Sequence, residues 1–216
     1  EAHHLNEFQK KALEDIISTF HNKDVTLLHG VTSSGKTEVY IHLIQEVLKQ
    51  NRQVLYLVPE IALTTQLTGR LQKVFGKSLA IYHSKFSDNE RVEVWNSLLL
   101  DKGIKIILGV RSSIFLPFKD LGLVIVDEEH ENTYKQQDPA PRYHARNAAI
   151  VLASMHGAKV LLGTATPSIE SYYNALQGKF GLVEMNSRYE GMELPEIRIA
   201  NTQELRRQRQ MPGNFS

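Results

Sequence analysis

The chain has 216 residues, of which 42% are hydrophobic and 23% are charged, and its formal net charge is +1. This length and composition are typical of one globular domain with a proper core, and such a small charge limits any nucleic-acid surface to a local patch. Cysteine is absent, which excludes disulfides, thiolate zinc sites and catalytic thiols from this chain. No apolar run approaches the roughly 20 residues that span a bilayer, and no secretory signal is visible. We therefore expect a cytoplasmic protein without a membrane partner.

Short apolar runs alternate with amphipathic stretches along the chain. A helix is predicted from Asn6 to about Phe20, and strands are predicted at 25–29, 54–58, 78–82, 104–108, 121–126 and 159–162. Further helices are predicted at 36–50, 60–75, 88–101, 144–156 and 168–177. Strands that alternate with helices indicate βαβ units, so we predict a three-layer α/β domain whose central sheet is mostly parallel. On the helix at 88–101, Trp95 is predicted to belong to the core.

The segment Gly30–Thr37 matches G-x-x-x-x-G-K-[ST], the pattern of a phosphate-binding P-loop. The predicted strand before it and the predicted helix after it supply the context that this motif requires. Backbone N–H groups in such a loop converge on phosphate oxygens, helped by the positive end of the helix. Lys36 would neutralise the β- and γ-phosphates of ATP, and the hydroxyl of Thr37 would bind Mg²⁺. The predicted ATP-binding residues of the loop are Gly30, Val31, Thr32, Ser33, Ser34, Gly35, Lys36 and Thr37.

A second motif, Asp127-Glu128-Glu129-His130, follows the apolar run of a predicted buried strand. Ligands of open α/β sheets bind at the carboxyl ends of the strands, and the P-loop leaves its own strand at that same edge. Asp127 would therefore hold Mg²⁺ and Glu128 would orient or deprotonate the attacking water. Taken alone, this segment would read as a solvated acidic turn, but its combination with a P-loop favours the catalytic interpretation.

The stretch 129–143 is predicted to form a long loop after this strand. It combines Tyr134 and Tyr143 with Lys135 and Arg142, and Arg146 follows. Aromatic rings interleaved with cations suit single-stranded DNA, because bases stack on rings while cations follow the phosphates. The alternative is a solvated loop whose tyrosines fold back onto the domain.

The regular pattern covers 1–185, which we predict to be one ATP-binding domain. Beyond it the pattern thins, with a possible strand at 196–200 and a basic helix at 203–209. We interpret 186–216 as an exit segment toward a second domain that this sequence lacks. The chain also begins without Met, so we expect it to be a piece of a longer protein.

Together these segments resemble the first RecA-like ATPase domain of superfamily 2 helicases of the DExH type, and within them the PriA family of bacterial replication-restart helicases. The resemblance covers nearly the whole chain, and the set of motifs in order is far more specific than any one of them. The matching segments are Leu5–Gln9, Gly30–Thr37 (motif I), Leu57–Thr64 (Ia), Tyr82–Ser84 with Glu90, Arg91 and Trp95, Gly109–Phe115 (Ib), Asp127–His130 (II) and Gly163–Ser168 (III).

The resemblance implies a bacterial ATP-dependent DNA helicase that moves 3′ to 5′ in replication restart, with ATP and Mg²⁺ as cofactors. It adds Gln9 as an adenine contact and His130 as a catalytic residue that links the carboxylates to motif III. It implies single-stranded or forked DNA as a partner, besides single-strand-binding protein and primosome helicase-loader proteins. The residues that it assigns to DNA binding or coupling are Thr64, Gln66, Arg111, Ser112, Tyr134, Lys135, Arg142, Tyr143, Thr164 and Thr166.

The chain departs from the family in two respects. Ser34 stands where the family usually has Gly, which would cost strain if that position required a positive φ. The second RecA-like domain, its arginine contacts and the family's cysteine-rich zinc region are absent, so zinc is expected only outside this chain. Two alternatives remain: a P-loop phosphotransferase acting on a small molecule, and a nucleotide-binding module with little turnover.

Overall fold

The computed structural model describes residues 4–31 and 34–185 of the chain. The strand expected at 196–200 and the helix expected at 203–209 lie outside the described residues. Seven strands form a single sheet in the order β3-β4-β2-β5-β6-β1-β7, and every pairing between neighbours is parallel. The strands are β1 (Val25–Gly30), β2 (Gln53–Leu57), β3 (Leu79–Tyr82), β4 (Ile106–Gly109), β5 (Leu121–Asp127), β6 (Lys159–Thr164) and β7 (Gly181–Met185). The predicted three-layer α/β fold is confirmed.

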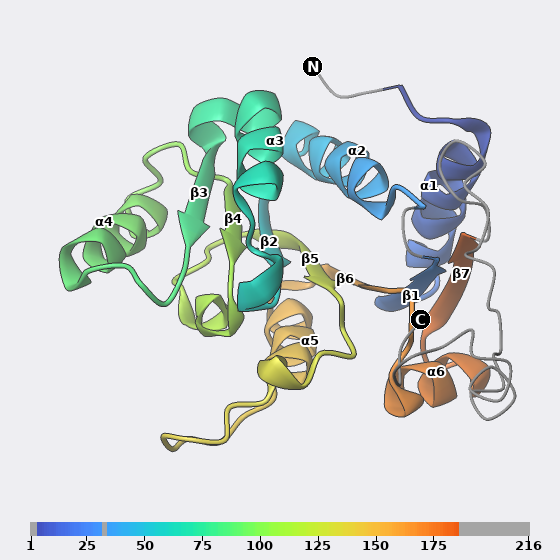
Figure 1. Ribbon diagram of the computed structural model, residues 1–216. Coiled ribbons are helices and arrows are strands. Elements are labelled where there is room, and N and C mark those ends of the chain that lie inside the picture. The colour runs from blue at the N-terminus through green and yellow to red at the C-terminus, as the bar shows by residue number, and fades with distance from the viewer. Residues whose placement is uncertain (1–3, 32–33, 186–216) are drawn as a thin grey trace, which may run out of the picture.

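Helices cover both faces of the sheet (Figure 1). The α-helices are α1 (Glu7–Phe20), α2 (Lys36–Lys49), α3 (Thr65–Phe75), α4 (Asp88–Leu99), α5 (Ala145–His156) and α6 (Ile169–Leu176), and short 3₁₀ turns lie at Glu60–Ala62, Gly76–Ser78, Arg111–Phe115 and Asn132–Tyr134. The first three helices pack on one face, and the last three pack on the other. Among the described helices, none combines the length and apolar character needed to cross a lipid bilayer.

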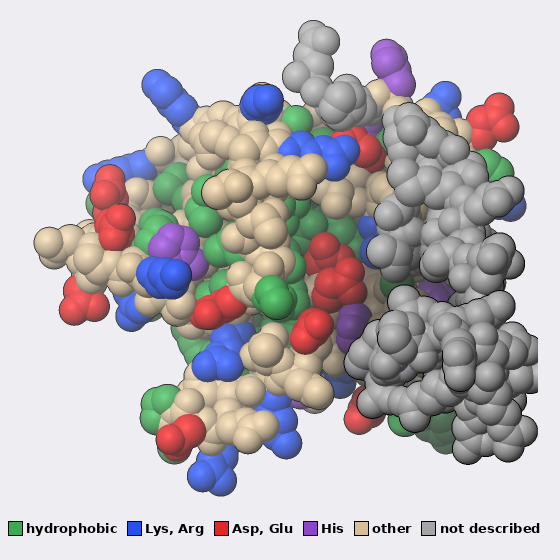
Figure 2. Space-filling view, viewed as in Figure 1, with side chains coloured by type: hydrophobic (Ala, Val, Ile, Leu, Met, Phe, Trp, Pro, Cys, Tyr) green, Lys and Arg blue, Asp and Glu red, His purple; other side chains and the backbone are tan. Residues whose placement is uncertain are grey.

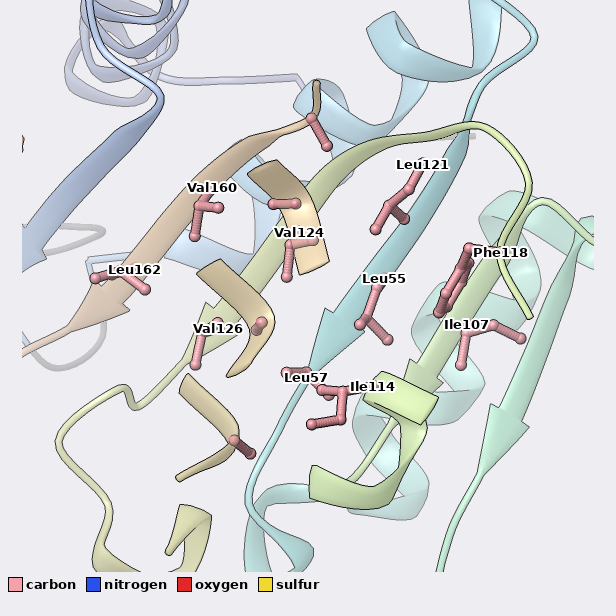
Figure 3. Close-up of a cluster of buried hydrophobic side chains, with 14 of the residues drawn as sticks. Leu55, Leu57, Ile107, Ile114, Phe118, Leu121, Val124, Val126, Val160 and Leu162 are labelled. Atoms are coloured by element: carbon pink, nitrogen blue, oxygen red, sulfur yellow. The ribbon is translucent and has the colours of Figure 1, made fainter. Parts of the chain in front are cut away.

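The core consists of two apolar layers that alternate along each strand. On β5, Val124 and Val126 face the layer beneath α5, whereas Leu123 and Ile125 face the layer beneath α2. Figure 3 shows the first of these layers, in which side chains from several strands converge under the helix. Because both faces of a parallel strand are buried, its sequence is a continuous apolar run rather than an alternating one. This is the pattern that marked 121–126 as a strand.

Three details differ from the sequence-based expectation. The helix expected over 60–75 is interrupted, because Thr64 adopts an extended backbone and its side chain caps α3 by accepting from the N–H of Leu67. The edge strand β7 was not predicted. Trp95 was expected in the core but is 44% exposed, while Val94 and Leu98 provide the packing of α4.

The close packing of α2 against β6 yields a prediction at Gly163. A Cβ atom there would lie 1.8 Å from the hydroxyl of Tyr40, a side chain that is fully buried and unable to swing away. We expect Gly163→Ala to destabilise the domain by about 1–3 kcal/mol through overpacking, which lowers the melting temperature by several degrees. Calorimetry of this variant, alone and with Tyr40→Phe, measures the effect.

The penalty of Gly163→Ala should shrink in the Tyr40→Phe background, since the clashing hydroxyl is gone. Equal penalties in both backgrounds would refute the steric explanation. Gly69→Ala is the matched control: it lies within α3 with no atom within 4 Å of the added carbon. It should stabilise the domain by about 0.5–1 kcal/mol, because alanine loses less conformational freedom in a helix.

Candidate nucleotide site and its surroundings

Three strands end side by side at the carboxyl edge of the sheet, and each delivers a predicted site residue. Gly30 ends β1, Asp127 ends β5 and Thr164 ends β6, which lies between the other two. Parallel strands share one carboxyl edge, so segments about ninety residues apart in the chain meet there. In the space-filling view, acidic side chains gather on the surface over the segment that follows β5 (Figure 2).

The described part of the P-loop adopts the backbone that the motif predicts. Gly35 has φ +80°, in the left-handed region that favours glycine, and α2 begins at the next residue. Ser34, which stands where the family usually has glycine, is buried, and its N–H donates to the carbonyl of Val31 at 3.1 Å. A Cβ on Gly30 would lie 2.9 Å from the Ser34 hydroxyl and 3.2 Å from the Lys36 side chain, so a larger residue here would force these side chains to shift. Thr32 and Ser33 lie outside the described residues.

Lys36 lies between the two motifs. Its ammonium group donates to the carbonyl of Gly30 at 2.8 Å and thus closes back over the loop. Burial lowers the pKa of Lys36, and the negative charges of Asp127 and Glu128 oppose that shift. Lys36 therefore interacts electrostatically with both carboxylates. This interaction agrees with the expectation that the P-loop and the acidic motif form one site.

Two buried tyrosines hold the carboxylate of Asp127. The hydroxyl of Tyr40 on α2 donates to Oδ1 at 3.0 Å, and the hydroxyl of Tyr56 on β2 donates to Oδ2 at 3.3 Å. Burial raises the pKa of Asp127 from 3.8 to about 6, and the charge of Glu128 adds to the shift. Thr37 also acts on Tyr56, where it opposes the rise in the pKa of the phenol that burial causes, so the two predicted Mg²⁺ ligands lie near the same side chain.

These groups fit a magnesium–triphosphate. A hydroxyl and a carboxylate are hard oxygen ligands, and Mg²⁺ in nucleotide sites takes one or two protein ligands while water and phosphates supply the rest. Within the described ranges, no group of three His, Asp or Glu side chains is placed to hold a metal ion without a substrate. The Oγ of Ser34 is buried and has no hydrogen-bond partner among the described residues. A polar atom left unpaired in a P-loop is a donor available to a phosphate oxygen.

Glu128 and His130 lie in a tight turn after β5. Glu128 has φ +49°, a conformation that residues other than glycine rarely adopt, and strain of this kind is concentrated at functional sites. The Nδ1 atom of His130 lies 3.6 Å from Oε2 of Glu128 and 2.7 Å from the hydroxyl of Thr164. The hydroxyl of Thr164 also accepts from the N–H of Thr166 at 3.0 Å. The histidine thus connects the acidic motif to the segment after β6.

Gln9 is buried and its side chain is engaged within the protein. The side-chain oxygen of Gln9 accepts from the backbone N–H of Asn6 at 2.9 Å, and the backbone N–H of Gln9 donates to the side chain of Asn6. These two hydrogen bonds form a capping box at the start of α1. Its amide nitrogen lies 3.4 Å from the carbonyl of Gly35. Gln9 therefore lies against the P-loop, and its contact with adenine stays a prediction.

The loop residues predicted to meet DNA are not all on the surface. Tyr134 is buried, and its hydroxyl donates to the backbone carbonyl of Asp127 at 2.6 Å, so it offers no free face for base stacking as it lies here. Arg146 is also buried, in an ion pair with Glu129, and is not available to a phosphate. Tyr134 therefore follows the alternative prediction, in which the tyrosines of the loop fold back onto the domain.

The remaining predicted DNA residues lie on or near the carboxyl edge. Lys135 and Arg142 are exposed on a projecting arm, residues 135–144, visible below α5 in Figure 1. Tyr143, at the base of the arm, is half-buried edge-to-face with Phe115 at 5.1 Å between ring centres. The others, exposed or half-buried at the starts of their elements, are Thr64, Gln66, Arg111 and Ser112.

Sequence reasoning missed the polar side chains that support the site from within the core. Tyr40 and Tyr56 lie in apolar runs and read there as core aromatics, although a phenol buried among aliphatic residues needs a hydrogen-bond partner. Glu129 was quoted only as part of the acidic motif. Its full burial requires paired donors, and these come from α5 and α6. The rule that buried polar groups must have hydrogen-bond partners could have predicted these contacts from the sequence.

Comparison with known proteins places this arrangement in context. The family model described as "DEAD/DEAH box helicase" matches residues 6–175. The chain is 41% identical to the replication restart protein PriA of Bacillus subtilis over 202 residues, which are 93% of this chain and 25% of that protein. It is 46% identical to the PriA of Rickettsia felis, covering 90% of this chain and 29% of that protein. The chain thus spans about a quarter of the length of these relatives.

Solved structures share the fold at lower sequence identity. RecG bound to a three-way DNA junction matches 88% of this chain and 25% of its own, with a TM-score of 0.63 and 22% identity. The DUF1998 helicase MrfA bound to DNA and AMPPNP matches 87% of this chain and 27% of its own, with a TM-score of 0.58 and 18% identity. These likenesses confirm the RecA-like architecture.

The raised pKa of Asp127 yields a prediction about pH. Because the folded pKa lies near 6 and the ordinary value is 3.8, the folded state binds a proton that the unfolded state has lost, and its stability falls as the pH rises through this window. In metal-free buffer, Asp127→Asn should therefore stabilise the domain by about 2–3 kcal/mol at pH 8 and by about half as much at pH 5.

Thermal unfolding at the two pH values, with chelator present, measures this difference. The carboxamide keeps the shape of the side chain and an acceptor for Tyr40, so loss of charge is the main change. Asp24→Asn, at a carboxylate that is 87% exposed and paired with Lys159, controls for the loss of a charge at the surface, where an ion pair is worth little. A gain from Asp127→Asn that is the same at both pH values would show that burial of the charge is not its source.

Proposed function

Because this chain belongs to the DEAD/DEAH box helicase family, we propose that it is the ATP-binding motor lobe of a 3′-to-5′ DNA helicase that acts in replication restart. The similarity to PriA proteins over about nine-tenths of this chain supports the assignment to that branch. ATP and Mg²⁺ are the cofactors, and single-stranded or forked DNA is the partner along which the lobe moves.

One observation carries the proposal: Tyr40, on the helix that begins with Lys36 and Thr37 of the P-loop, donates to Asp127 at the end of β5 at 3.0 Å. Thr37 and Asp127, two oxygen ligands of the type that Mg²⁺ prefers, are thus brought together from separate parts of the chain. Beside them, the negative charges of Asp127 and Glu128 favour the charged form of Lys36. Thr37 and Asp127 would hold Mg²⁺ here, and the bound ion would neutralise negative charge on the triphosphate.

The side chains then take distinct roles in hydrolysis. Lys36 leaves the carbonyl of Gly30 and neutralises the terminal phosphates, while backbone N–H groups of residues 30–37 cradle them. Glu128 orients the attacking water and accepts its proton. His130 links the acidic motif to the segment after β6, because it bonds to the hydroxyl of Thr164, which in turn accepts from the N–H of Thr166. A change at the carboxylates is thereby transmitted to that segment. Gln9, adjacent to the P-loop, contacts the adenine ring.

DNA would bind across the carboxyl edge and the arm. Lys135 and Arg142 supply positive charge on the arm, and Tyr143 supplies an aromatic surface at its base. Thr64 and Gln66 at the start of α3, with Arg111 and Ser112 after β4, offer hydroxyl, amide and guanidinium donors to the backbone of the strand. Tyr134 does not contact DNA directly in this arrangement. It connects the base of the arm to the acidic motif through its hydrogen bond to the carbonyl of Asp127.

Turnover by this chain alone should be slow. We propose that 1–185 form the ATP-binding unit and that 186–216 lead toward a second RecA-like domain. That domain would supply the arginine that accelerates hydrolysis by roughly 10³–10⁵ in related enzymes. By resemblance, single-strand-binding protein and helicase-loader proteins are further partners, and any thiolate zinc site lies outside this cysteine-free chain. A small-molecule phosphotransferase gains no support from the family match.

The proposal predicts a specific loss at Lys36. Lys36→Ala should weaken the binding of Mg·AMPPNP about 10- to 100-fold, because charge-assisted hydrogen bonds to phosphate are worth roughly 1.5–3 kcal/mol. Isothermal titration calorimetry on this chain measures it. Lys49→Ala on the same helix, which breaks only an exposed pair with Glu46, should leave the affinity unchanged.

Glu128→Gln should bind the same nucleotide with nearly the wild-type affinity, since its role begins only with the water. If Lys36→Ala and Lys49→Ala bind equally well, the P-loop is not the nucleotide site and the proposed function is wrong.

A further inference from the structure

Tyr40 and Tyr56 are buried phenols whose hydroxyls both donate to the carboxylate of Asp127, and neither has a part in the hydrolysis described above. Their rings pack edge to face, with centres 5.5 Å apart and an angle of 81° between the planes. Tyr40 lies on α2, which begins in the P-loop, whereas Tyr56 lies on β2. The carboxylate is thus held from two separate elements of the core.

These hydrogen bonds occupy most of the acceptor capacity of the Asp127 carboxylate. An ionised carboxylate has about four lone-pair positions, shared equally by its oxygens. Oδ1 accepts from the Tyr40 hydroxyl at 3.0 Å and from the backbone N–H of Glu128 at 3.1 Å. Oδ2 accepts from the Tyr56 hydroxyl at 3.3 Å. Counting the contacts of the described residues, Oδ1 is fully engaged, and the position left for a further group lies on Oδ2.

Gly163 on β6 leaves the space that the Tyr40 hydroxyl occupies. A Cβ atom at Gly163 would collide with that hydroxyl and would lie 3.4 Å from Oδ1 of Asp127. Gly163 and Asp127 are paired in register on the neighbouring strands β6 and β5. Because Tyr40 itself has no solvent-accessible surface, its phenol is confined to a position from which it donates to Oδ1.

Mg²⁺ and Ca²⁺ make different demands on a carboxylate of this kind. Mg²⁺ requires near-ideal octahedral geometry, keeps several waters and takes few protein oxygens beside the phosphates. Ca²⁺ is larger, takes more oxygens in a flexible geometry and often engages both oxygens of one carboxylate. A carboxylate that is fixed by three donors and has one free position meets the demands of Mg²⁺ and not those of Ca²⁺.

We propose that Tyr40 is a positioning residue that makes the nucleotide site selective for Mg²⁺ over Ca²⁺, because it keeps Oδ1 of Asp127 occupied and the carboxylate fixed. The inference rests on the proposed function, since it requires that a metal–nucleotide complex binds at this edge. Without the Tyr40 hydroxyl, Oδ1 loses one of its two donors, and the carboxylate can turn to offer both oxygens to the larger cation. Gly163 contributes by leaving room for the phenol.

Isothermal titration calorimetry of AMPPNP at pH 8, with saturating Mg²⁺ in one series and saturating Ca²⁺ in another, tests this without any turnover. The measured quantity is the ratio of the two affinities, in which damage that weakens both complexes equally cancels. The wild-type chain should bind AMPPNP more tightly with Mg²⁺ than with Ca²⁺. In Tyr40→Phe the ratio should shift about tenfold toward Ca²⁺, the lower end of the effect that groups orienting metal ligands have on metal affinity.

Tyr56→Phe is the matched control, since it removes the same atom from the other phenol of the pair. In this variant Oδ1 keeps both of its donors, so the carboxylate stays fixed and the ratio should remain close to the wild-type value. Gly163→Ala perturbs the same contact from the opposite side, because the added carbon displaces the Tyr40 hydroxyl while the phenol remains. It should shift the ratio in the same direction as Tyr40→Phe.

The outcomes separate the two proposals. If the wild-type chain does not bind AMPPNP with Mg²⁺, the proposed function fails and this inference fails with it. If the wild-type chain binds equally well with Ca²⁺, or if Tyr40→Phe keeps the wild-type ratio, the selectivity role alone is overturned. An equal shift in Tyr56→Phe would also overturn it, because loss of either phenol would then explain the effect. Should Tyr40→Phe not fold, Gly163→Ala decides the question, and an unchanged ratio there contradicts the proposal.

Discussion

The carboxylate of Asp127 is the group around which this domain is arranged. It ends the central strand, yet its oxygens are held by phenols from a helix and a strand that precede it by more than seventy residues. One of those phenols, Tyr40, lies on the helix that begins at the P-loop, so α2, β2 and the acid share a single set of hydrogen bonds. The position of each motif therefore depends on the packing of the layer beneath α2, and the site cannot be rearranged without disturbing the core.

Such a carboxylate is costly without a cation. Burial favours its neutral form, and the partly buried ammonium of Lys36 compensates only in part. A divalent ion brought in with a triphosphate supplies the missing charge and thereby stabilises the folded lobe. The same chemistry explains why a tyrosine pair suits this position: phenols donate to the carboxylate without adding a competing positive charge.

Most of the architecture followed from the sequence because burial on both faces leaves continuous apolar runs, and because parallel strands bring their carboxyl ends together. That logic placed the P-loop and Asp127 at one edge. It could not specify which side chains meet inside the core, since contacts such as Tyr134 with the Asp127 carbonyl depend on packing across the fold. The break before α3 depends on one capping hydroxyl, at Thr64, which a helical periodicity does not reveal. Arg146 was read as a surface cation because its buried acidic partner lies 17 residues away.

The exposed position of Trp95 has a practical consequence. It is the chain's single tryptophan, and nearly half of its surface lies in contact with solvent on a helix at the edge of the domain. Its indole emission will therefore resemble that of a hydrated ring even in the native state, and unfolding will change it little. The same ring makes a sensitive spectroscopic reporter for any molecule that covers α4.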